Sequence, residues 1–202
     1  MNDVTRHYDS LIDENNDPVH DPQLLKDYMD KWDGREFLDA MRLDHTKSVL
    51  EIGVGTGRLA ARVIPHCLHF TGIDISPLTI ERAKENLSDF GNVSLICADF
   101  SEYGFDCLFD VVYSSLTMMH FENKQAMISK TASLLKDNGI FCLSIDKDRR
   151  EVIDMGSYKL KIYPDNPDSI TECIKAANLK LERVFETEFA YIFVCSKIVD
   201  NR

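Results

Sequence analysis

The chain has 202 residues, of which 44% are hydrophobic, so it is long enough to bury one core of ordinary size without disulfides or metal ions. Its formal net charge of −11 disfavours binding to a phosphate backbone, because nucleic-acid-binding proteins cluster Lys and Arg. We therefore expect a single domain, residues 1–202, and no nucleic-acid partner.

The N-terminus and the cysteines give no sign of export. The first residues have neither a basic start nor an apolar core, and no apolar run is long enough to cross a bilayer. The six cysteines include no C-x-x-C pair, and several lie inside apolar runs. We expect a cytoplasmic protein that does not associate with membranes.

Residues 1–44 differ from the rest of the chain, because they are rich in Asp and Asn and contain a helical pattern at 23–41 that should break at Gly34. This acidic stretch also carries four aromatic side chains, Tyr8, Tyr28, Trp32 and Phe37. We predict an N-terminal helical lid in which Tyr8, Tyr28 and Trp32 are the substrate or lid residues, with Tyr8 the sharper candidate for a contact to cofactor or substrate. The alternative for Trp32 is an apolar helix stripe that packs on the core.

From residue 48 onward, short β-branched runs alternate with amphipathic segments, which is typical of a mostly parallel, doubly wound α/β sheet covered by helices. The expected strands are 49–52, 70–73, 93–96, 109–113 and 140–145. The expected helices are 57–64, 77–87, 124–135 and 169–177. Residues 151–164 predict a small flap, and the runs at 181–186 and 191–196 predict a closing antiparallel hairpin.

The stretch SVLEIGVGTGRLAARVI places three glycines at alternate positions directly after the first expected strand, namely Gly53, Gly55 and Gly57. In an open α/β sheet this turn lets a ligand approach the backbone. The dinucleotide motif G-x-G-x-x-G requires a glycine at position 58, where this chain has Arg58. The carboxylate of Glu51 would repel a pyrophosphate and attract a cation. The loop therefore predicts a cationic ligand.

The pattern E-x-G-x-G-x-G resembles the cofactor loop of the class I S-adenosylmethionine-dependent methyltransferases. Four further blocks match that family in order: GIDIS at 72–76, ICADF at 96–100, FDVVYSSLTMMHF at 109–121 and LLKDNGIFCLSID at 134–146. The resemblance covers residues 48–197. It implies a Rossmann-like, seven-stranded sheet that ends in an antiparallel hairpin, with residues 45–202 as the core that binds S-adenosyl-L-methionine.

The resemblance also implies roles for individual residues. Asp74 is expected to accept hydrogen bonds from the ribose hydroxyls, and Asp99 to meet the adenine amino group beside Phe100. Glu51 and Asp99 also have structural interpretations. Glu51 could form a hydrogen bond to its own loop, and Asp99 could cap the next turn. The expected cofactor-binding residues are Glu51, Gly53, Val54, Gly55, Gly57, Asp74, Ile75, Asp99, Phe100, Ser114 and Ser115.

Methyl transfer from a sulfonium depends mainly on alignment and on the exclusion of water, so it has no mandatory catalytic residue. A base helps when the acceptor arrives protonated, and a histidine with a near-neutral pKa suits that role. His120 is the candidate, with a packed loop residue as its alternative. After the fourth strand the sequence Ser114-Ser115-Leu116 lacks both a Pro-Pro motif and a metal-binding aspartate, which disfavours methylation of bases or glutamine and predicts no metal.

We therefore predict an S-adenosylmethionine-dependent methyltransferase that acts on a small-molecule acceptor, as a monomer or a homodimer. One alternative is a regulatory protein that binds the cofactor without turnover. A less favoured alternative is a nicotinamide-dependent oxidoreductase, because the spacing of the glycines opposes it.

Overall fold

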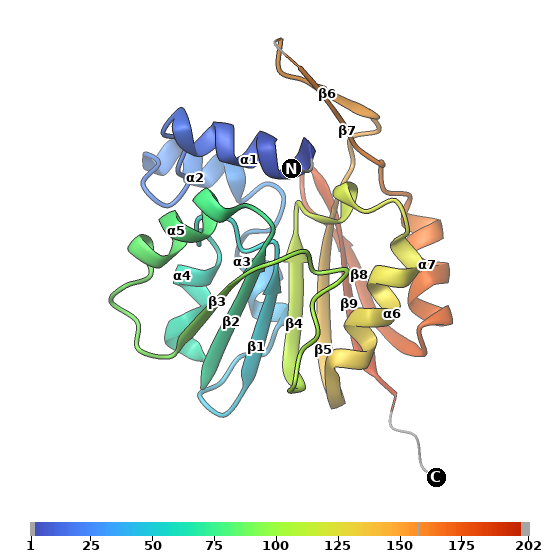
Figure 1. The fold of residues 1–202 in the computed structure, drawn as a ribbon. Helices are drawn as coiled ribbons and strands as arrows, with labels where there is room; N and C mark the ends of the chain where they lie inside the picture. The colour runs from blue at the N-terminus through green and yellow to red at the C-terminus, as the bar shows by residue number, and fades with distance from the viewer. Residues whose placement is uncertain (1–2, 157, 199–202) are drawn as a thin grey trace.

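The computed structural model describes residues 3–156 and 158–198, and it is built around one seven-stranded sheet (Figure 1). The strand order is β3-β2-β1-β4-β5-β9-β8. The strands are β1 (Ser48–Ile52), β2 (His69–Asp74), β3 (Val93–Cys97), β4 (Phe109–Ser115), β5 (Leu135–Asp146), β8 (Leu179–Glu186) and β9 (Ala190–Lys197). Strands β1 to β5 pair in parallel, whereas β9 runs antiparallel to both β5 and β8. The predicted fold class and its closing hairpin are confirmed.

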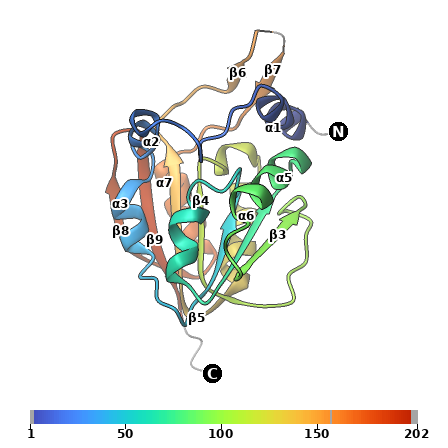
Figure 2. The same ribbon diagram turned by 90° about the vertical axis from the view of Figure 1, so that its left-hand side faces the viewer.

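Helices cover both faces of the sheet (Figure 2). One face carries α3 (Gly34–Ala40), α4 (Ala60–Val63) and α5 (Pro77–Asn86), and the other carries α6 (Lys124–Leu134) and α7 (Pro167–Ala176). Successive residues of a strand point to opposite faces. In β1, Leu50 and Ile52 therefore pack toward α6, while Val49 packs toward α3 and α4. The strand order reverses between β1 and β4, and ligands of open α/β sheets bind beyond such a switch point.

The first expected helix after the glycine loop is shorter than predicted. Residues 53–57 are taken up by the loop, so α4 begins only at residue 60, and a 3-10 turn, η1 (Ile64–His66), follows it. Pro65 lies within this turn, where its fixed φ is compatible with helical geometry. The later helices begin near the predicted residues, because Ser76, Asn123 and Asn166 accept backbone N–H groups at their starts.

The N-terminal segment divides into parts with different surroundings. Helices α1 (Asp3–Asp13) and α2 (Gln23–Met29) lie over the carboxyl ends of the central strands, beside a two-stranded flap formed by β6 (Val152–Asp154) and β7 (Lys159–Lys161) (Figure 1). Helix α3 instead packs in the core, where Phe37 and the following Met41 are fully buried. Residues 1–2 of the predicted lid, residue 157 of the predicted flap and residues 199–202 lie outside the described residues.

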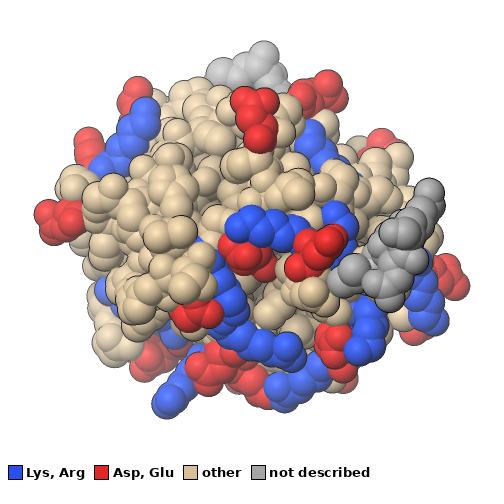
Figure 3. Space-filling view, turned by 90° about the horizontal axis from the view of Figure 1, so that it is seen from below, with Lys and Arg blue, Asp and Glu red and all other residues tan. Residues whose placement is uncertain are grey.

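The end of the molecule opposite α1 and α2 mixes charges of both signs (Figure 3). Lys and Arg side chains lie among Asp and Glu side chains across this face. Several of these charges form ion pairs, as in Lys136–Asp110, where the nitrogen and oxygen are 2.7 Å apart. Within the part of the chain that is described, no helix has the length and apolar character needed to span a bilayer.

Candidate functional site

A cavity of about 300 Å³ lies beyond the carboxyl ends of β1, β2 and β4, under α1. Its wall includes eleven of the residues predicted from sequence: Tyr8, Glu51, Gly53, Val54, Gly55, Asp74, Ile75, Asp99, Phe100, Ser115 and His120. Four other predicted residues do not line it: Tyr28, Trp32, Gly57 and Ser114. The structure thus brings the glycine loop, the acidic strand ends and one lid residue together around a single space.

A side chain is excluded for different reasons at the three glycines of the loop. Gly53, Gly55 and Gly57 all have positive φ, at 77°, 56° and 100°. A Cβ on Gly53 would collide with the side chain of Thr117, and one on Gly57 would crowd Leu87 at 3.0 Å. A Cβ on Gly55 would meet nothing within 4 Å, although the residue lines the cavity. Gly55 is therefore the position where the backbone is open to a ligand.

Asp74 ties the end of β2 to the glycine loop. Its Oδ2 accepts a hydrogen bond from the backbone N–H of Gly55 at 3.0 Å, and its Oδ1 accepts one from Ser76 N at 3.0 Å. Burial raises the pKa of this carboxyl, against the lowering effect of the backbone donors. Each carboxylate oxygen has two lone pairs, so Asp74 can accept further hydrogen bonds from a ligand in the cavity.

Glu51 is a buried carboxyl in the middle of the sheet, with 3% of its surface exposed. Its partner is Tyr113 on the neighbouring β4, whose hydroxyl donates to Oε2 at 2.7 Å, and not the loop that was considered from sequence. Burial raises the pKa of Glu51 from 4.5 to about 8, although the nearby Arg58 lowers it. The site therefore holds a proton on Glu51 at neutral pH, and binding of a cation would favour loss of that proton to solvent.

Asp99 follows β3, where it caps the next turn and also lines the cavity. Its Oδ1 accepts from both the backbone N–H of Ser101, at 2.8 Å, and the Ser101 hydroxyl, at 2.7 Å, so it caps the turn. It also lines the cavity next to Phe100, which is buried and packs against Phe121 with ring centroids 6.4 Å apart. Capping fixes the carboxylate in place and leaves its second oxygen for a ligand.

The buried Asp33, with 1% of its surface exposed, was missed from sequence. The Arg58 guanidinium donates to both of its carboxylate oxygens, at 3.0 Å to Oδ1 and 2.5 Å to Oδ2, and the Ser115 hydroxyl donates to Oδ2 at 2.8 Å. Arg58 is thus committed to a bidentate pair and is not a free cation in the cavity. The one local signal was an acidic residue before Gly34, which reads as an ordinary helix cap.

Three consecutive residues attach α1 to three different parts of the rim. His7 Nδ1 lies 2.8 Å from the hydroxyl of Tyr158 in the flap. Tyr8 Oη lies 2.8 Å from Nε2 of His120, in the 3-10 turn η2 (Met118–His120) after β4. Asp9 Oδ1 accepts from the hydroxyl of Ser76 at 2.6 Å, at the start of α5. Helix α1 therefore spans the cavity and is attached to its rim at three places.

His120 is held in a neutral state. Burial lowers the pKa of its imidazole to about 4, and the positive charges that His7 and Lys124 can carry lower it further. The expected near-neutral pKa is therefore wrong, because the sequence did not show that α1 covers this side chain. Its Nδ1 is buried and has no hydrogen-bond partner among the described residues. At pH 7 the imidazole carries a proton on one ring nitrogen only, so its other nitrogen can accept a proton from a ligand.

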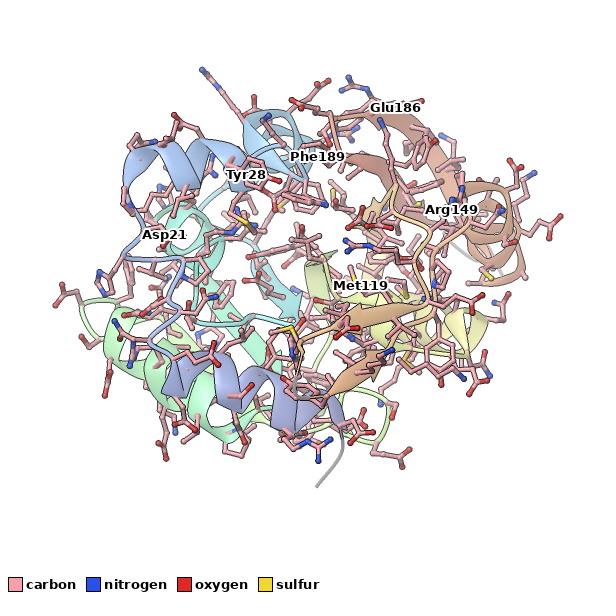
Figure 4. The ribbon with its side chains drawn as sticks, turned by 90° about the horizontal axis from the view of Figure 1, so that it is seen from above. Asp21, Tyr28, Met119, Arg149, Glu186 and Phe189 are labelled. Atoms are coloured by element: carbon pink, nitrogen blue, oxygen red, sulfur yellow. The ribbon has the colours of Figure 1, made fainter. Side chains whose placement is uncertain are left out.

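Tyr28 and Trp32 dock the N-terminal segment on the β8–β9 turn. Their rings form a cluster with Phe189, with centroids 4.7 Å apart for Trp32–Phe189 and 5.7 Å for Tyr28–Phe189. Trp32 Nε1 also donates to Asp146 at the end of β5, at 3.1 Å. Figure 4 shows Tyr28 and Phe189 side by side, across from Met119 and Arg149. The packing interpretation describes Trp32, and the structure places neither ring in the cavity wall.

Two other predicted residues act inside the scaffold. The Ser114 hydroxyl is buried and donates to the carbonyl of Ile52 at 3.0 Å, which joins β4 to β1. Gly57 packs against Leu87 at the back of the loop. Over residues 3–156 and 158–198, no group of three or more His, Cys, Asp or Glu side chains is arranged to hold a metal ion.

Residues 49–139 match the family described as a methyltransferase domain. Malonyl-[acyl-carrier protein] O-methyltransferase of Acetivibrio thermocellus is 30% identical over 111 residues, which are 53% of this chain and 39% of that protein. Nodulation protein S of Sinorhizobium fredii is 25% identical over 108 residues, which are 51% of this chain and 50% of that protein. The chain spans half or less of the length of these two curated relatives.

A solved structure shows the same fold over nearly the whole chain. The N-methyltransferase NodS from Bradyrhizobium japonicum, in complex with S-adenosyl-L-homocysteine, aligns with a TM-score of 0.68 at 20% identity, covering 94% of this chain and 97% of that one. This likeness in fold agrees with the domain match. The domain match, the curated relatives and the shared fold agree that this chain is similar to S-adenosylmethionine-dependent methyltransferases.

Proposed function

We propose that this protein transfers a methyl group from S-adenosyl-L-methionine to a small-molecule acceptor. The observation that carries the proposal is the acidic character of the cavity wall, which is lined by the carboxyl groups of Glu51, Asp74 and Asp99. In the described part of the chain, Arg58 is the one Lys or Arg that lines the cavity, and its charge is paired with Asp33. Such a wall suits a ligand that presents hydrogen-bond donors and a net positive charge.

The residues present fit the cofactor group by group. S-adenosyl-L-methionine carries two ribose hydroxyls, an adenine amino group and an ammonium, which are all donors, and when bound it supplies a methyl group on a positively charged sulfonium. Asp74 and Asp99 have free acceptor capacity for the ribose and the adenine, and Phe100 offers an apolar surface to the ring. The open side of Gly55 admits close contact with the backbone.

Glu51 contributes selectivity for a cation. Its carboxyl is protonated in the ligand-free cavity, because burial raises its pKa to about 8. A cation in the cavity favours the ionised form and thereby displaces the proton. A neutral or anionic ligand of the same shape would lack this attraction, which supports S-adenosyl-L-methionine over a nicotinamide dinucleotide.

The acceptor is proposed to react beside Tyr8 and His120, at the rim formed by α1 and η2. The neutral imidazole of His120 can take the proton of an O–H, N–H or S–H acceptor. Tyr8 fixes the imidazole through its hydrogen bond and, with the rest of α1, keeps water out of the cavity. The named relatives include both an O- and an N-methyltransferase, so the proposal extends to a small-molecule acceptor and not to one acceptor atom.

Calorimetry and an acceptor screen test this function. We expect S-adenosyl-L-methionine and S-adenosyl-L-homocysteine to bind and NAD to show no binding. The screen would follow release of S-adenosyl-L-homocysteine with matched amines, phenols, alcohols, thiols and carboxylic acids. Release with any acceptor establishes an enzyme and excludes a regulator without turnover. Binding of NAD in place of the two sulfur compounds would contradict the proposal.

A further inference from the structure

Tyr158 connects the flap to α1 by hydrogen bonds. Tyr158 lies just before β7, and its hydroxyl is 2.8 Å from His7 Nδ1 and 3.0 Å from Ser10 Oγ, both on α1. In the described structure, the Tyr158 side chain forms these two hydrogen bonds. The flap rises beside α1 and away from the sheet, so few other contacts join the two (Figure 1).

The directions of these hydrogen bonds follow from counting protons. The Ser10 hydroxyl donates its only proton to the carbonyl of His7, at 2.7 Å. Ser10 Oγ therefore accepts a hydrogen bond from the Tyr158 hydroxyl. Because the Tyr158 hydroxyl has only this one proton, His7 Nδ1 must be the donor in its hydrogen bond to Tyr158 Oη. The bonds form a closed ring that starts and ends on His7. The ring assigns the proton of His7 to Nδ1, and removal of the Tyr158 hydroxyl breaks two of its three bonds.

The residue after His7 is the one that reaches the cavity. Consecutive side chains on an α-helix point about 100° apart, so His7 faces the flap while Tyr8 faces His120. Because both side chains extend from one rigid turn, fixing His7 fixes the rotation of the turn and hence the place of Tyr8. The bond from Asp9 to Ser76 holds the same turn on the α5 side but does not contact the flap.

We propose that Tyr158 is a positioning residue for the methyl-transfer site: through its hydrogen-bond ring with His7 and Ser10, it holds α1 where Tyr8 meets His120 over the cavity. This inference rests on the proposed function. It follows that the flap and α1 form one closing unit. A ligand that orders either part stabilises the other, and the coupling is reciprocal.

Tyr158→Phe tests the role of the hydroxyl alone. The phenyl ring remains, and with it the contact to the Arg6 guanidinium, whose carbon lies 5.4 Å from the ring centroid. Tyr163→Phe is the matched control. Tyr163 belongs to the same segment, and in the described structure its hydroxyl forms no hydrogen bond. His7→Asn keeps a side-chain N–H donor near the position of Nδ1, whereas His7→Ala removes it, so the first should rescue what the second loses.

The first measurement is hydrogen exchange of residues 3–13 in the ligand-free protein, with the thermal unfolding temperature as a check on the fold. We expect exchange about three- to tenfold faster in Tyr158→Phe, as for the loss of one net hydrogen bond, and unchanged in Tyr163→Phe. Equal exchange in Tyr158→Phe and wild type would overturn the proposal. An equal acceleration in Tyr163→Phe would also overturn it, because the effect would then belong to the flap in general.

The second measurement is a double-mutant cycle on the affinity for S-adenosyl-L-homocysteine. If Tyr158 acts through Tyr8, then Tyr158→Phe weakens binding about three- to tenfold in the wild type and has almost no further effect in Tyr8→Phe. Additive effects would show that Tyr158 acts by another route and would overturn the positioning role. Failure of the wild type to bind S-adenosyl-L-homocysteine contradicts the proposed function, and hydrogen exchange still decides whether Tyr158 holds α1.

Discussion

The hydroxyl of Tyr8 lies 2.8 Å from Nε2 of His120, although 112 residues separate the two in sequence. One side chain belongs to the first helix and the other to the turn after β4, so their contact closes the cavity from two sides. Burial under α1 lowers the pKa of His120 and raises that of Tyr8, so both are neutral at pH 7.

His120→Ala should lower turnover about 10²- to 10⁴-fold once an acceptor is known, because it removes the proposed base. Affinity for S-adenosyl-L-homocysteine should fall by no more than about tenfold, as for the loss of the Tyr8–His120 hydrogen bond, so the larger loss of turnover separates chemistry from binding. Since burial lowers the pKa of His120 to about 4, the rate of the wild type should be steady near neutral pH and fall as the pH drops through about 4. Equal turnover in mutant and wild type would restore the packing interpretation.

Asp74→Ala should weaken binding of S-adenosyl-L-homocysteine at least tenfold, because each hydrogen bond to a charged acceptor contributes about 1.5–3 kcal/mol. The change also removes the acceptor for Gly55 N and Ser76 N, so Asp74→Asn, which keeps one carbonyl oxygen, is the control. Calorimetry measures the affinities, and circular dichroism shows whether each variant folds. An unchanged dissociation constant in a folded Asp74→Ala protein would exclude the ribose role.

Gly55→Val should abolish cofactor binding for two reasons. The residue has φ 56°, which a β-branched side chain adopts only with strain, and the new methyl groups would enter the open space beside the loop. Gly91→Val is the control for added bulk, because a Cβ there also meets nothing within 4 Å but the residue does not line the cavity. A folded Gly55→Val protein that binds S-adenosyl-L-homocysteine normally would show that the loop is not the site.

Glu51→Gln should remove a pH dependence of the stability of the ligand-free protein. The folded-state pKa of about 8 lies above the ordinary 4.5, so the folded protein holds this proton more tightly than the unfolded chain does. The stability that Glu51 contributes is therefore full below about pH 4.5 and is lost as the pH rises through about 8. Thermal unfolding of the ligand-free protein across this window should show the loss in wild type and not in the variant.

The same carboxyl links cofactor binding to proton release. Because a cation favours ionised Glu51, affinity for S-adenosyl-L-methionine should rise with pH and level off above about pH 8 in the wild type. Calorimetry in buffers of different ionisation enthalpy measures the released proton directly. A Glu51→Gln protein that releases the same proton on binding would assign it to another group.

Limited proteolysis tests whether α1 and α2 close over the cofactor. Ligand should stabilise the closed arrangement and slow cleavage between residues 3 and 29, since a lid opens before it is cut. Addition of S-adenosyl-L-homocysteine should therefore protect this segment, while cleavage near the C-terminus serves as the internal reference. Cleavage of the segment at the same rate with and without the ligand would mean that it does not act as a lid.

The parts of the fold that could be predicted are those encoded over short distances. Apolar runs bounded by turn residues located every strand of the seven-stranded sheet, and the placement of Glu51 and Asp74 at strand ends followed from the topology. The predicted ends of an element were wrong where two local sequence signals overlapped. The expected helix at 57–64 lost its first turn to the glycine loop, whose positive φ values are incompatible with a helix.

The parts that could not be predicted depend on contacts between distant segments. Asp33 reads as a helix cap, and nothing near it in sequence shows that Arg58 and Ser115 converge on it. The aromatic composition of residues 1–44 suggested a lid but could not tell which ring would face the cavity. Tyr8 does, while Trp32 packs on Phe189 and binds Asp146, because the packing of α2 against the β8–β9 turn decides its direction.

The buried pair between Asp33 and Arg58 sets the smallest fragment of this chain that can be expected to fold. A fragment that starts at residue 45 would leave the guanidinium of Arg58, whose side chain is 15% exposed, without its buried counter-charge Asp33. It would also remove the fully buried Phe37 and Met41 from the core. Sequence similarity to the methyltransferase domain begins at residue 49, but α3 precedes that residue and contributes to the core, so an expressed fragment should keep it.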